Sequence, residues 1–332
     1  MKLAQLTVEG ILGAPDGTFS FTDDAGQPLD VVVLSGDEGS GTTSLLEAIG
    51  ILKEHVGGYG AAPAPSTVLR GGAARGRVAT SWALFDDERR RVGAPSALCS
   101  VELLIDKASA RVANASADLG PLFERFSRDP GEGKFEYFPA NRELEAVGGL
   151  PIEPVLPAAL QAASRLGKAR DKYAFVHGVL AEAALGAGDD VLRALRRDGV
   201  VLGGPSSDQL EPYRKAFARL TDRVRLDGMT MQARRPGLRF VRRDGAALGF
   251  DDLSASDRQA LLFATTFVHL GLEHSIVLID EPELHIHPAR QADFLRCLSL
   301  LGADNQLIVA SSSAGILRAA RPHQVVRIAE PR

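Results

Sequence analysis

The chain has 332 residues, of which 45% are hydrophobic and 24% are charged, and its formal net charge is −4. This composition predicts a globular protein with a substantial core and excludes disorder, while the charge balance excludes a global field that attracts DNA or anionic lipid. Two cysteines are too few for a disulfide framework or a zinc cluster. No apolar run approaches the ~20 residues that span a bilayer, and the N-terminus has no signal-peptide core, so we expect a cytoplasmic protein without a membrane anchor.

The first part of the chain carries strand patterns around one glycine-rich loop. Residues 2–9 alternate apolar and polar side chains, which predicts a half-buried strand, and a second strand is expected near residues 18–22. Residues 31–34 are a continuous apolar, mostly β-branched run, typical of a strand buried on both faces. The glycine-rich loop follows this run and leads into an amphipathic helix. Strand-like stretches between residues 77 and 115 predict an antiparallel layer.

The second part begins with a helical composition and ends in alternating elements. Residues 154–199 are rich in Ala, Leu and Arg, which predicts helices. Residues 238–250 read as a β-hairpin with a turn at Asp244-Gly245. After them the pattern predicts helices and strands in alternation, at residues 255–272, 276–279, 288–301, 306–310, 314–320 and 324–328.

The glycine-rich loop has the spacing of a phosphate-binding loop, G-x-x-x-x-G-K-[ST]. Its residues run Gly36-Asp-Glu-Gly-Ser-Gly-Thr-Thr43, between a strand and a helix as the motif requires. Glycines allow backbone N–H groups to surround a phosphate at a helix N-terminus. Thr43 keeps the hydroxyl that binds Mg²⁺, but Thr42 stands at the lysine position. A glycine-rich strand-to-helix turn without a ligand is the competing interpretation of this loop.

A second motif favours the phosphate-binding interpretation. Residues 276–279 form an apolar strand that ends in Asp280 and Glu281, the Walker B pattern. Asp280 would hold Mg²⁺ through its water shell, and Glu281 would orient or deprotonate the attacking water. Such a strand roughly 240 residues after a phosphate-binding loop is much less common than a strand that ends in acids alone.

A third motif lies directly before a predicted helix. Leu253-Ser-Ala-Ser-Asp-Arg-Gln259 is similar to the ABC signature, Leu-Ser-x-Gly-Glu/Gln. In that signature, a serine and a helix N-terminus contact the γ-phosphate held by the opposite subunit. Ser254 followed by Asp257 also reads as a helix capping box, and the two interpretations are compatible.

With these motifs in this order, the chain resembles compact ABC-type ATPase heads related to SMC, RecF and overcoming-lysogenization-defect proteins. The segment Tyr137-Phe-Pro-Ala-Asn-Arg142 is similar to that family's strand-plus-Arg segment, and Glu283-Leu-His-Ile-His287 follows Walker B as its D-loop does. The resemblance implies an α/β P-loop fold of the ABC-head type, with a mixed sheet, an antiparallel β layer and a helical insertion. It implies one head, divided into an N-terminal lobe at residues 1–149, an insertion at 150–215 and a C-terminal lobe at 216–332.

The resemblance also implies a nucleotide site and a way of using it. ATP and Mg²⁺ are the implied cofactors, with Mg²⁺ at Thr43 and Asp280. Two heads, in a homodimer or a heterodimer, would hold nucleotide between them and act as a dimerisation switch. The implied catalytic positions are Glu281 and Ser312. The implied nucleotide-binding positions are Gly36, Gly39, Ser40, Gly41, Thr42, Thr43, Arg142, Ser254 and Ser256.

The departures from the family pattern predict weak hydrolysis. Besides Thr42 for lysine, Ser256 replaces the signature glycine, and Ser312 stands where the switch segment has histidine. Asp37 and Glu38 add negative charge to the loop. Only seven residues of the chain are lysines. A pseudo-ATPase that serves as a scaffold or regulatory subunit for a partner protein is therefore the second functional hypothesis.

Two further patterns have competing interpretations. The arginine clusters at residues 89–91, 234–235 and 242–243 favour solvated faces over a nucleic-acid-binding head, the third and weaker hypothesis, because the net charge is negative. Arg165, Lys168, Arg170 and Lys172 are the best candidates for a basic stripe on the insertion. His285 and His287 fit the D-loop position better than a metal site, since no partner has ligand spacing.

Overall fold

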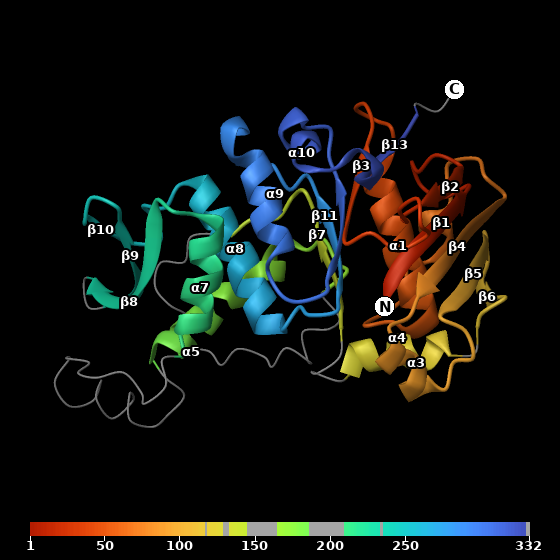
Figure 1. Ribbon diagram of the computed structural model, residues 1–332, viewed down its shortest axis with the longest axis horizontal. Coiled ribbons are helices and arrows are strands. Elements are labelled where there is room, and N and C mark those ends of the chain that lie inside the picture. Colours follow the sequence, from red (N-terminus) through yellow and green to blue (C-terminus); the bar gives the residue numbers. More distant parts are fainter. Residues whose placement is uncertain (117, 129–132, 145–164, 186–208, 233–234, 330–332) are drawn as a thin grey trace. The chain divides into compact units, whose positions relative to one another are not determined.

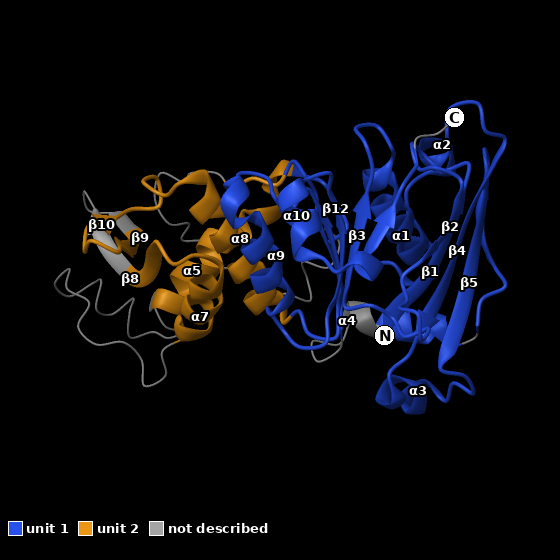
Figure 2. Ribbon diagram, turned by 45° about the horizontal axis from the view of Figure 1, so that its top comes forward, with its two compact units in different colours: residues 1–141, 158–169, 272–332 blue, residues 142–157, 170–271 orange. Residues whose placement is uncertain are grey.

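The computed structural model describes residues 1–116, 118–128, 133–144, 165–185, 209–232 and 235–329 (Figure 1). The chain divides into two compact units, each assembled from distant parts of the sequence (Figure 2). Unit 1 comprises residues 1–141, 158–169 and 272–332, and unit 2 comprises residues 142–157 and 170–271. The predicted division at residues 149 and 215 follows chain order and remains a prediction. Among the described residues, no helix has both the length and the apolar character needed to cross a membrane.

Unit 1 contains a five-stranded parallel sheet. Its order is β13 (Val325–Arg327), β3 (Val31–Ser35), β12 (Gln306–Ala310), β11 (Ile276–Asp280) and β7 (Phe135–Phe138). Every described neighbour pair in this sheet is parallel. The strands β7, β11 and β12 are buried along their whole length. Burial on both faces explains the continuous apolar runs of β11 and β12, whereas β7 includes the buried Glu136.

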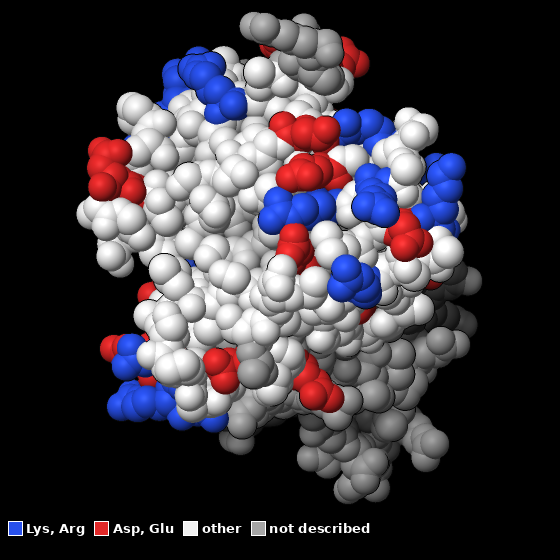
Figure 3. All heavy atoms as spheres, turned by 90° about the vertical axis from the view of Figure 1, so that its right-hand side faces the viewer, with Lys and Arg blue, Asp and Glu red and all other residues white. Residues whose placement is uncertain are grey.

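Unit 1 also contains a five-stranded antiparallel sheet, so the strands of the two kinds lie in separate sheets. Its order is β2 (Gly17–Ser20), β1 (Lys2–Glu9), β4 (Arg75–Ala83), β5 (Leu98–Asp106) and β6 (Ala110–Ala113). Alternate residues of β4 and β5 are buried, as expected for a sheet with one face on the core. The side of the molecule that lies on the right in Figure 1 carries charges of both signs beside a broad area of uncharged side chains (Figure 3).

The helix α1 (Thr42–Gly57) packs between these two sheets (Figure 1). It contacts β11 and β12 on one side and β1, β4, β5 and β6 on the other. Its buried leucines and isoleucines join the largest apolar core of the unit. Buried Gln306 links the sheets directly, since its amide nitrogen donates to the backbone carbonyls of Leu3 and Leu29 at 2.9 Å each. The fold therefore fixes the start of α1 against both sheets.

Shorter helices complete unit 1, and only those at residues 288–299 and 314–319 were expected from the sequence. The C-terminal predictions are confirmed in order, with a 3₁₀ turn ahead of α9. The remaining elements of the unit are α2 (Pro65–Val68), α3 (Asp86–Val92), α4 (Leu119–Arg128), η3 (Pro288–Arg290), α9 (Gln291–Ser299), α10 (Ala314–Ala319) and η4 (Pro322–Gln324).

Unit 2 combines helices with a three-stranded sheet. Its helices are η2 (Arg170–Tyr173), α5 (Phe175–Leu185), α7 (Glu211–Leu220) and α8 (Ala255–Leu270). Its antiparallel sheet has the order β10 (Ala247–Leu248), β9 (Arg235–Arg242) and β8 (Val224–Gln232). The predicted hairpin is confirmed by β9 and β10, whereas β8 was not predicted. Of the predicted helical segment at 154–199, residues 154–164 and 186–199 lie outside the described residues, and α5 confirms part of the rest.

Candidate functional site

The candidate site lies at the carboxyl edge of the parallel sheet in unit 1. Strand pairing places Leu34, Ala310 and Asp280 in one row across β3, β12 and β11. The segments that follow these three strands therefore leave the sheet at the same edge, where ligands bind in open α/β sheets. These segments are the glycine-rich loop, the serine-rich switch segment and the acidic end of Walker B.

The glycine-rich loop needs its glycines for backbone geometry. Gly39 and Gly41 have φ angles of 82° and 86°, in the left-handed region that side chains disfavour. A Cβ on Gly41 would lie 2.1 Å from the carbonyl oxygen of Gly13, and a Cβ on Gly36 would lie 2.3 Å from the Ser40 Oγ. The loop leads directly into α1, whose first turn holds no acidic residue. The partial positive charge of the helix N-terminus is therefore available to an anion.

The contact between Thr43 and Asp280 joins the two predicted metal-binding positions. The Thr43 hydroxyl lies 3.0 and 3.1 Å from the two carboxylate oxygens of Asp280, although the residues are 237 positions apart. Asp280 is buried, and Thr43 is half-buried. The expected position of Asp280 at a strand end facing the loop is confirmed. A hydroxyl and a carboxylate are oxygen ligands of the kind that Mg²⁺ prefers.

Ser40 supplies an independent test of whether the loop fits a phosphate. Its side chain is buried, and within the described part of the chain its Oγ has no hydrogen-bond partner. A buried hydroxyl without a partner costs free energy, and a phosphate oxygen would accept its proton. The loop therefore fits a phosphate at Ser40 and a magnesium ion at Thr43 and Asp280. The one part of the motif that does not fit is Thr42, which has no positive charge.

Glu281 occupies a strained backbone position beside the metal-binding pair. Its φ angle is 49°, which is uncommon for a residue with a side chain. Its backbone N–H donates to the carbonyl of Ala310 at 2.9 Å, which fixes it to the neighbouring strand, and its side chain is exposed. Strained residues of this kind are concentrated at functional sites. Glu281 is therefore an exposed acid in a strained position at the end of β11, and its predicted role in orienting water remains a prediction.

The switch segment places Ser312 between two serines with structural contacts. The Ser311 hydroxyl donates to Glu283 Oε1 at 2.7 Å, and Ser313 caps α10 by accepting from the backbone N–H of Gly315. Ser312 itself is exposed. A serine hydroxyl lies closer to its own backbone than an imidazole nitrogen does, so Ser312 has less reach than a histidine here.

The segment that corresponds to the expected D-loop contains His285 and His287, for which a metal site is the competing interpretation. His285 has a φ angle of 65°, and His287 Nδ1 accepts from the backbone N–H of Ala289 at 3.2 Å. Among the described residues, no group of three or more His, Cys, Asp or Glu side chains is arranged to hold a metal ion.

The signature-like segment lies in unit 2, where its capping role is confirmed. The Ser254 side chain accepts from the backbone N–H of Asp257 and begins α8. Asp257 is buried and pairs with Arg223 at 3.2 Å. Ser256 is half-buried, one position before this acid. The contacts account for the helix start, and the predicted contact of Ser254 and Ser256 with nucleotide remains a prediction.

Arg142 has structural contacts inside unit 2. Its side chain is buried, its Nε donates to Gln259 Oε1 at 2.9 Å, and its guanidinium lies 5.1 Å from the ring centroid of Phe263. These contacts orient the guanidinium toward α8. Its predicted contact with nucleotide remains a prediction.

Comparisons with known proteins bear on the fold that carries this site. Residues 167–318, less than half of the chain, match a family model described as "AAA domain, putative AbiEii toxin, Type IV TA system". A solved structure entitled "Crystal structure of the SmcHead bound to the C-winged helix domain of ScpA" aligns with a TM-score of 0.55 and 14% identity, over 96% of this chain and 92% of that one. The chain has the fold of an SMC-type ATPase head.

A second solved structure supports the same fold for this chain. It is the Smc head domain with an extended coiled coil bound to the C-terminal domain of ScpA, from Pyrococcus furiosus. It aligns with a TM-score of 0.53 and 13% identity, over 96% of this chain and 92% of that chain. No curated protein sequence gives a significant match. The predicted resemblance to ABC-type heads is therefore confirmed at the level of fold.

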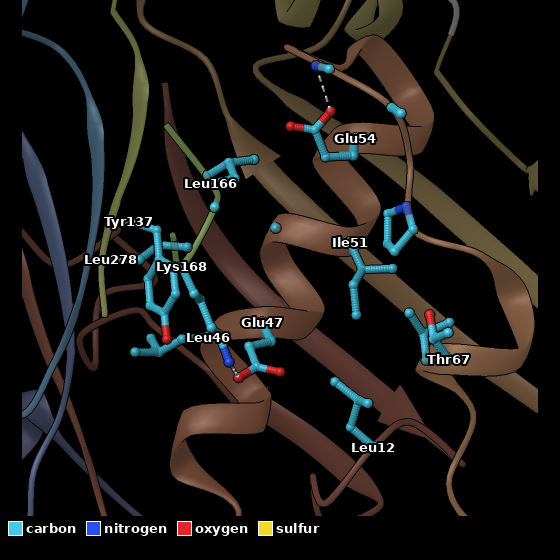
Figure 4. A pocket seen from close by; sticks show the side chains of 16 residues that line it. Leu12, Leu46, Glu47, Ile51, Glu54, Thr67, Tyr137, Leu166, Lys168 and Leu278 are labelled. Carbon is cyan, nitrogen blue, oxygen red and sulfur yellow. Dashed lines mark hydrogen bonds and ion pairs between the residues drawn. The ribbon is translucent and has the colours of Figure 1, made fainter. Parts of the chain in front are cut away.

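The predicted basic stripe is wrong. Arg165 and Lys172 are buried. Their cations lie over aromatic rings, at 5.2 Å from the ring centroid of Tyr59 and 5.4 Å from that of Tyr173. The exposed Lys168 pairs with Glu47 of α1 instead (Figure 4). No local pattern indicates this pair, since its members are 121 positions apart.

Proposed function

We propose that this SMC-type head binds ATP with Mg²⁺ at the edge of its parallel sheet, and that nucleotide controls its association with a second head. The observation that carries the proposal is the contact of Thr43 with Asp280 beneath a glycine-rich loop. The buried Ser40 hydroxyl and the acid-free first turn of α1 add support, because both favour an anion at the same place.

The proposed roles follow from the contacts. The backbone of the loop from Gly36 to Thr43 holds the phosphates, and Thr43 and Asp280 hold the magnesium ion. The ion, when bound, neutralises charge on the phosphates. Glu281 orients the attacking water from its exposed position at the strand end. Ser254 and Ser256, at the start of α8, contact the nucleotide of the second head through the helix N-terminus.

We expect this site to hydrolyse ATP slowly. A donor that stabilises charge in the transition state contributes ~2.7–4 kcal/mol, which is about a hundredfold to a thousandfold in rate. Thr42 supplies no such cation in the loop, and Ser312 has a shorter reach than the switch histidine it replaces. Thr43 and Asp280 nevertheless provide oxygen ligands for Mg²⁺, so we expect magnesium-dependent binding of ATP even though hydrolysis of ATP is slow.

A scaffold function is the second candidate, and two observations favour it. The loop carries Thr42 where the motif has lysine. Both structural relatives are SMC heads bound to a domain of ScpA, a partner protein. By analogy, this chain would contact a partner protein of its own whether or not nucleotide is present.

Calorimetry tests the proposed site with a matched pair of variants. ATP is titrated into the purified protein with Mg²⁺ and with EDTA. We expect metal-dependent binding to the wild type and to Thr43→Ser, which keeps the hydroxyl. Thr43→Ala should bind at least tenfold more weakly, since a hydrogen bond to a charged group contributes ~1.5–3 kcal/mol. Equal binding by both variants would remove Thr43 from the site.

The oligomeric state separates the switch from the scaffold. Light scattering is measured with ATP and Mg²⁺, with ADP and without nucleotide. A nucleotide-dependent switch should shift from monomer to dimer with ATP. A mass that is the same under all three conditions would favour the scaffold.

A further inference from the structure

The missing lysine of the glycine-rich loop has a candidate replacement elsewhere in unit 1. Lys168 Nζ donates to Glu47 Oε1 on α1, as the dashed line in Figure 4 shows. Glu47 follows Thr43 by four positions on α1, so the two side chains lie on the same face of the helix. The structure thus brings one ammonium group to the helix that begins at the phosphate-binding loop.

Helix geometry places this ammonium near the site. Helical side chains tilt toward the N-terminus, so the Glu47 carboxylate lies over the turn that contains Thr43, and one turn is ~5.4 Å along the axis. The backbone of Lys168 is held in place, since Asn141 Nδ2 donates to its carbonyl at 3.2 Å. Asn141 follows β7, whose carboxyl end lies at the same edge of the parallel sheet. The Lys168 side chain is 48% exposed, so its four-carbon stem is free to turn.

The other lysines have positions that do not suit this role. Lys53 is fully buried and donates to the carbonyl of Gly57 at the far end of α1. Lys172 is buried in unit 2, and Lys215 pairs with Glu211 on α7. Lys168, by contrast, has its ion-pair partner Glu47 on the first turns of α1.

We propose that Lys168 is a phosphate-binding residue that supplies the cation absent at Thr42. This inference rests on the proposed function, because it needs ATP at the loop. In the free protein Glu47 holds the ammonium; when nucleotide binds, the ammonium exchanges Glu47 for phosphate oxygens. The exchange is favourable because a partly exposed ion pair is weak, whereas a charge-assisted bond to a phosphate is strong.

Binding of ATP with Mg²⁺ to four variants tests the assignment by calorimetry. Lys168→Met should weaken binding by about 10- to 100-fold, the value of one charge-assisted hydrogen bond. Lys168→Arg should retain most of the affinity. Glu47→Gln should bind as tightly as the wild type or tighter, since it releases the ammonium. The matched control is Lys215→Met, an exposed lysine in an ion pair on another helix, and it should bind as the wild type does.

A fifth variant tests whether a lysine at position 42 can replace Lys168. Thr42→Lys in the Lys168→Met background should restore binding, because the loop then carries its own cation. Thermal unfolding of each variant checks that the fold is retained. A structural role for the ion pair predicts that Lys168→Met and Glu47→Gln weaken binding equally, and that result would overturn the proposal.

The outcomes also separate this inference from the proposed function. If the wild type binds ATP with Mg²⁺ and Lys168→Met binds equally well, Lys168 is not the cation, and the proposed function stands. If the wild type does not bind ATP, the proposed function fails, and the role of Lys168 fails with it.

Discussion

The two ends of α1 show opposite chemistry on one helix. At the N-terminal end, the left-handed Gly41 begins the helix, no acidic residue lies in the first turn, and Thr43 meets Asp280. At the C-terminal end, Lys53 is fully buried and donates to the carbonyl of Gly57. Its ammonium lies 4.0 Å from the ring centroid of Tyr59 and within 5.6 Å of two phenylalanine rings.

This difference shows that the N-terminal end of α1 suits an anionic ligand, whereas the C-terminal end contributes to the stability of the fold. The N–H groups at the start of a helix favour an anion, and the carbonyl groups at its end favour a cation. The protein places a lysine at the carbonyl end, where it contributes to the fold, and a threonine at the amide end, where the family motif has lysine. Changes at the N-terminal end should therefore alter nucleotide binding, and changes at the C-terminal end should alter stability.

The largest effect is expected at Thr43 and Asp280, the proposed metal-binding pair. Asp280→Ala removes both carboxylate oxygens that contact Thr43, so we expect magnesium-dependent ATP binding to fall at least a hundredfold. Calorimetry with Mg²⁺ and with EDTA measures this loss. The control Asp293→Ala removes an exposed carboxylate that pairs with Arg296 on α9, and its binding should equal that of the wild type. Undiminished binding by Asp280→Ala would show that the pair is structural.

The next effect concerns Thr42 at the N-terminal end of α1, which lacks the positive charge of a lysine. Steady-state phosphate release by the wild type should lie well below 1 s⁻¹, the lower end of the ordinary enzyme range of about 1–10³ s⁻¹. Thr42→Lys should raise it by about 100- to 1,000-fold, and adding Ser256→Gly and Ser312→His should raise it further. Wild-type turnover near 1 s⁻¹ would contradict the prediction.

Much of the N-terminal end of α1 could be predicted from the sequence. The apolar runs at 31–34 and 276–279 identify strands buried on both faces, and the carboxyl ends of such strands meet at one sheet edge. The contact of Thr43 with Asp280 follows from those two facts. The same reasoning predicted the capping of α8 by Ser254, because a capping serine needs only a local pattern.

The contacts that were missed join residues without a local signal. Lys168 was assigned to a basic stripe, because composition alone does not reveal that Arg165 beside it is buried over Tyr59. The surroundings of Lys53 have no local signal either, because the rings of Phe123 and Phe135 come from distant elements, although Tyr59 is six residues away. The strand β8 was missed because Gly228 interrupts its alternation, where the pairing with β9 also shifts register.

A smaller effect is expected from a matched pair of glycines in the loop. Gly39 and Gly41 share a left-handed backbone, but a Cβ on Gly39 meets nothing within 4 Å, whereas a Cβ on Gly41 would lie 2.1 Å from a backbone oxygen. Gly39→Ala should cost ~1–2 kcal/mol in the free energy of unfolding, the penalty of the left-handed conformation. Gly41→Ala should cost clearly more and also weaken ATP binding. Chemical denaturation of the two variants measures the difference, and equal costs would show that the close approach of Gly13 is not maintained in solution.

The last effect concerns the C-terminal end of α1, is comparable in size to that of Gly39→Ala and depends on pH. Burial lowers the pKa of Lys53 from 10.5 to about 7; nearby Glu54 raises it, and nearby Arg165 lowers it further. Between about pH 7 and 10.5 the unfolded chain binds a proton at this lysine that the folded chain does not bind. Stability therefore rises with pH in this range by up to ~1.4 kcal/mol per unit, and below pH 7 the contribution is constant.

Chemical denaturation at pH 8 and pH 9.5 measures this contribution. We expect the wild type to gain up to about 2 kcal/mol from Lys53 across that interval, and Lys53→Met to lack this gain. The interval stays below pH 10, because burial raises the pKa of Tyr59 to about 12 and its titration would lower stability at higher pH. Other groups contribute equally to both proteins, so the difference between their slopes isolates Lys53.

Lys107→Met, which removes an exposed lysine, should keep the wild-type slope. Equal slopes for the wild type and Lys53→Met would mean that the Gly57 carbonyl and the aromatic rings hold the ammonium charged throughout, and the two ends of α1 would then both be sites for ions.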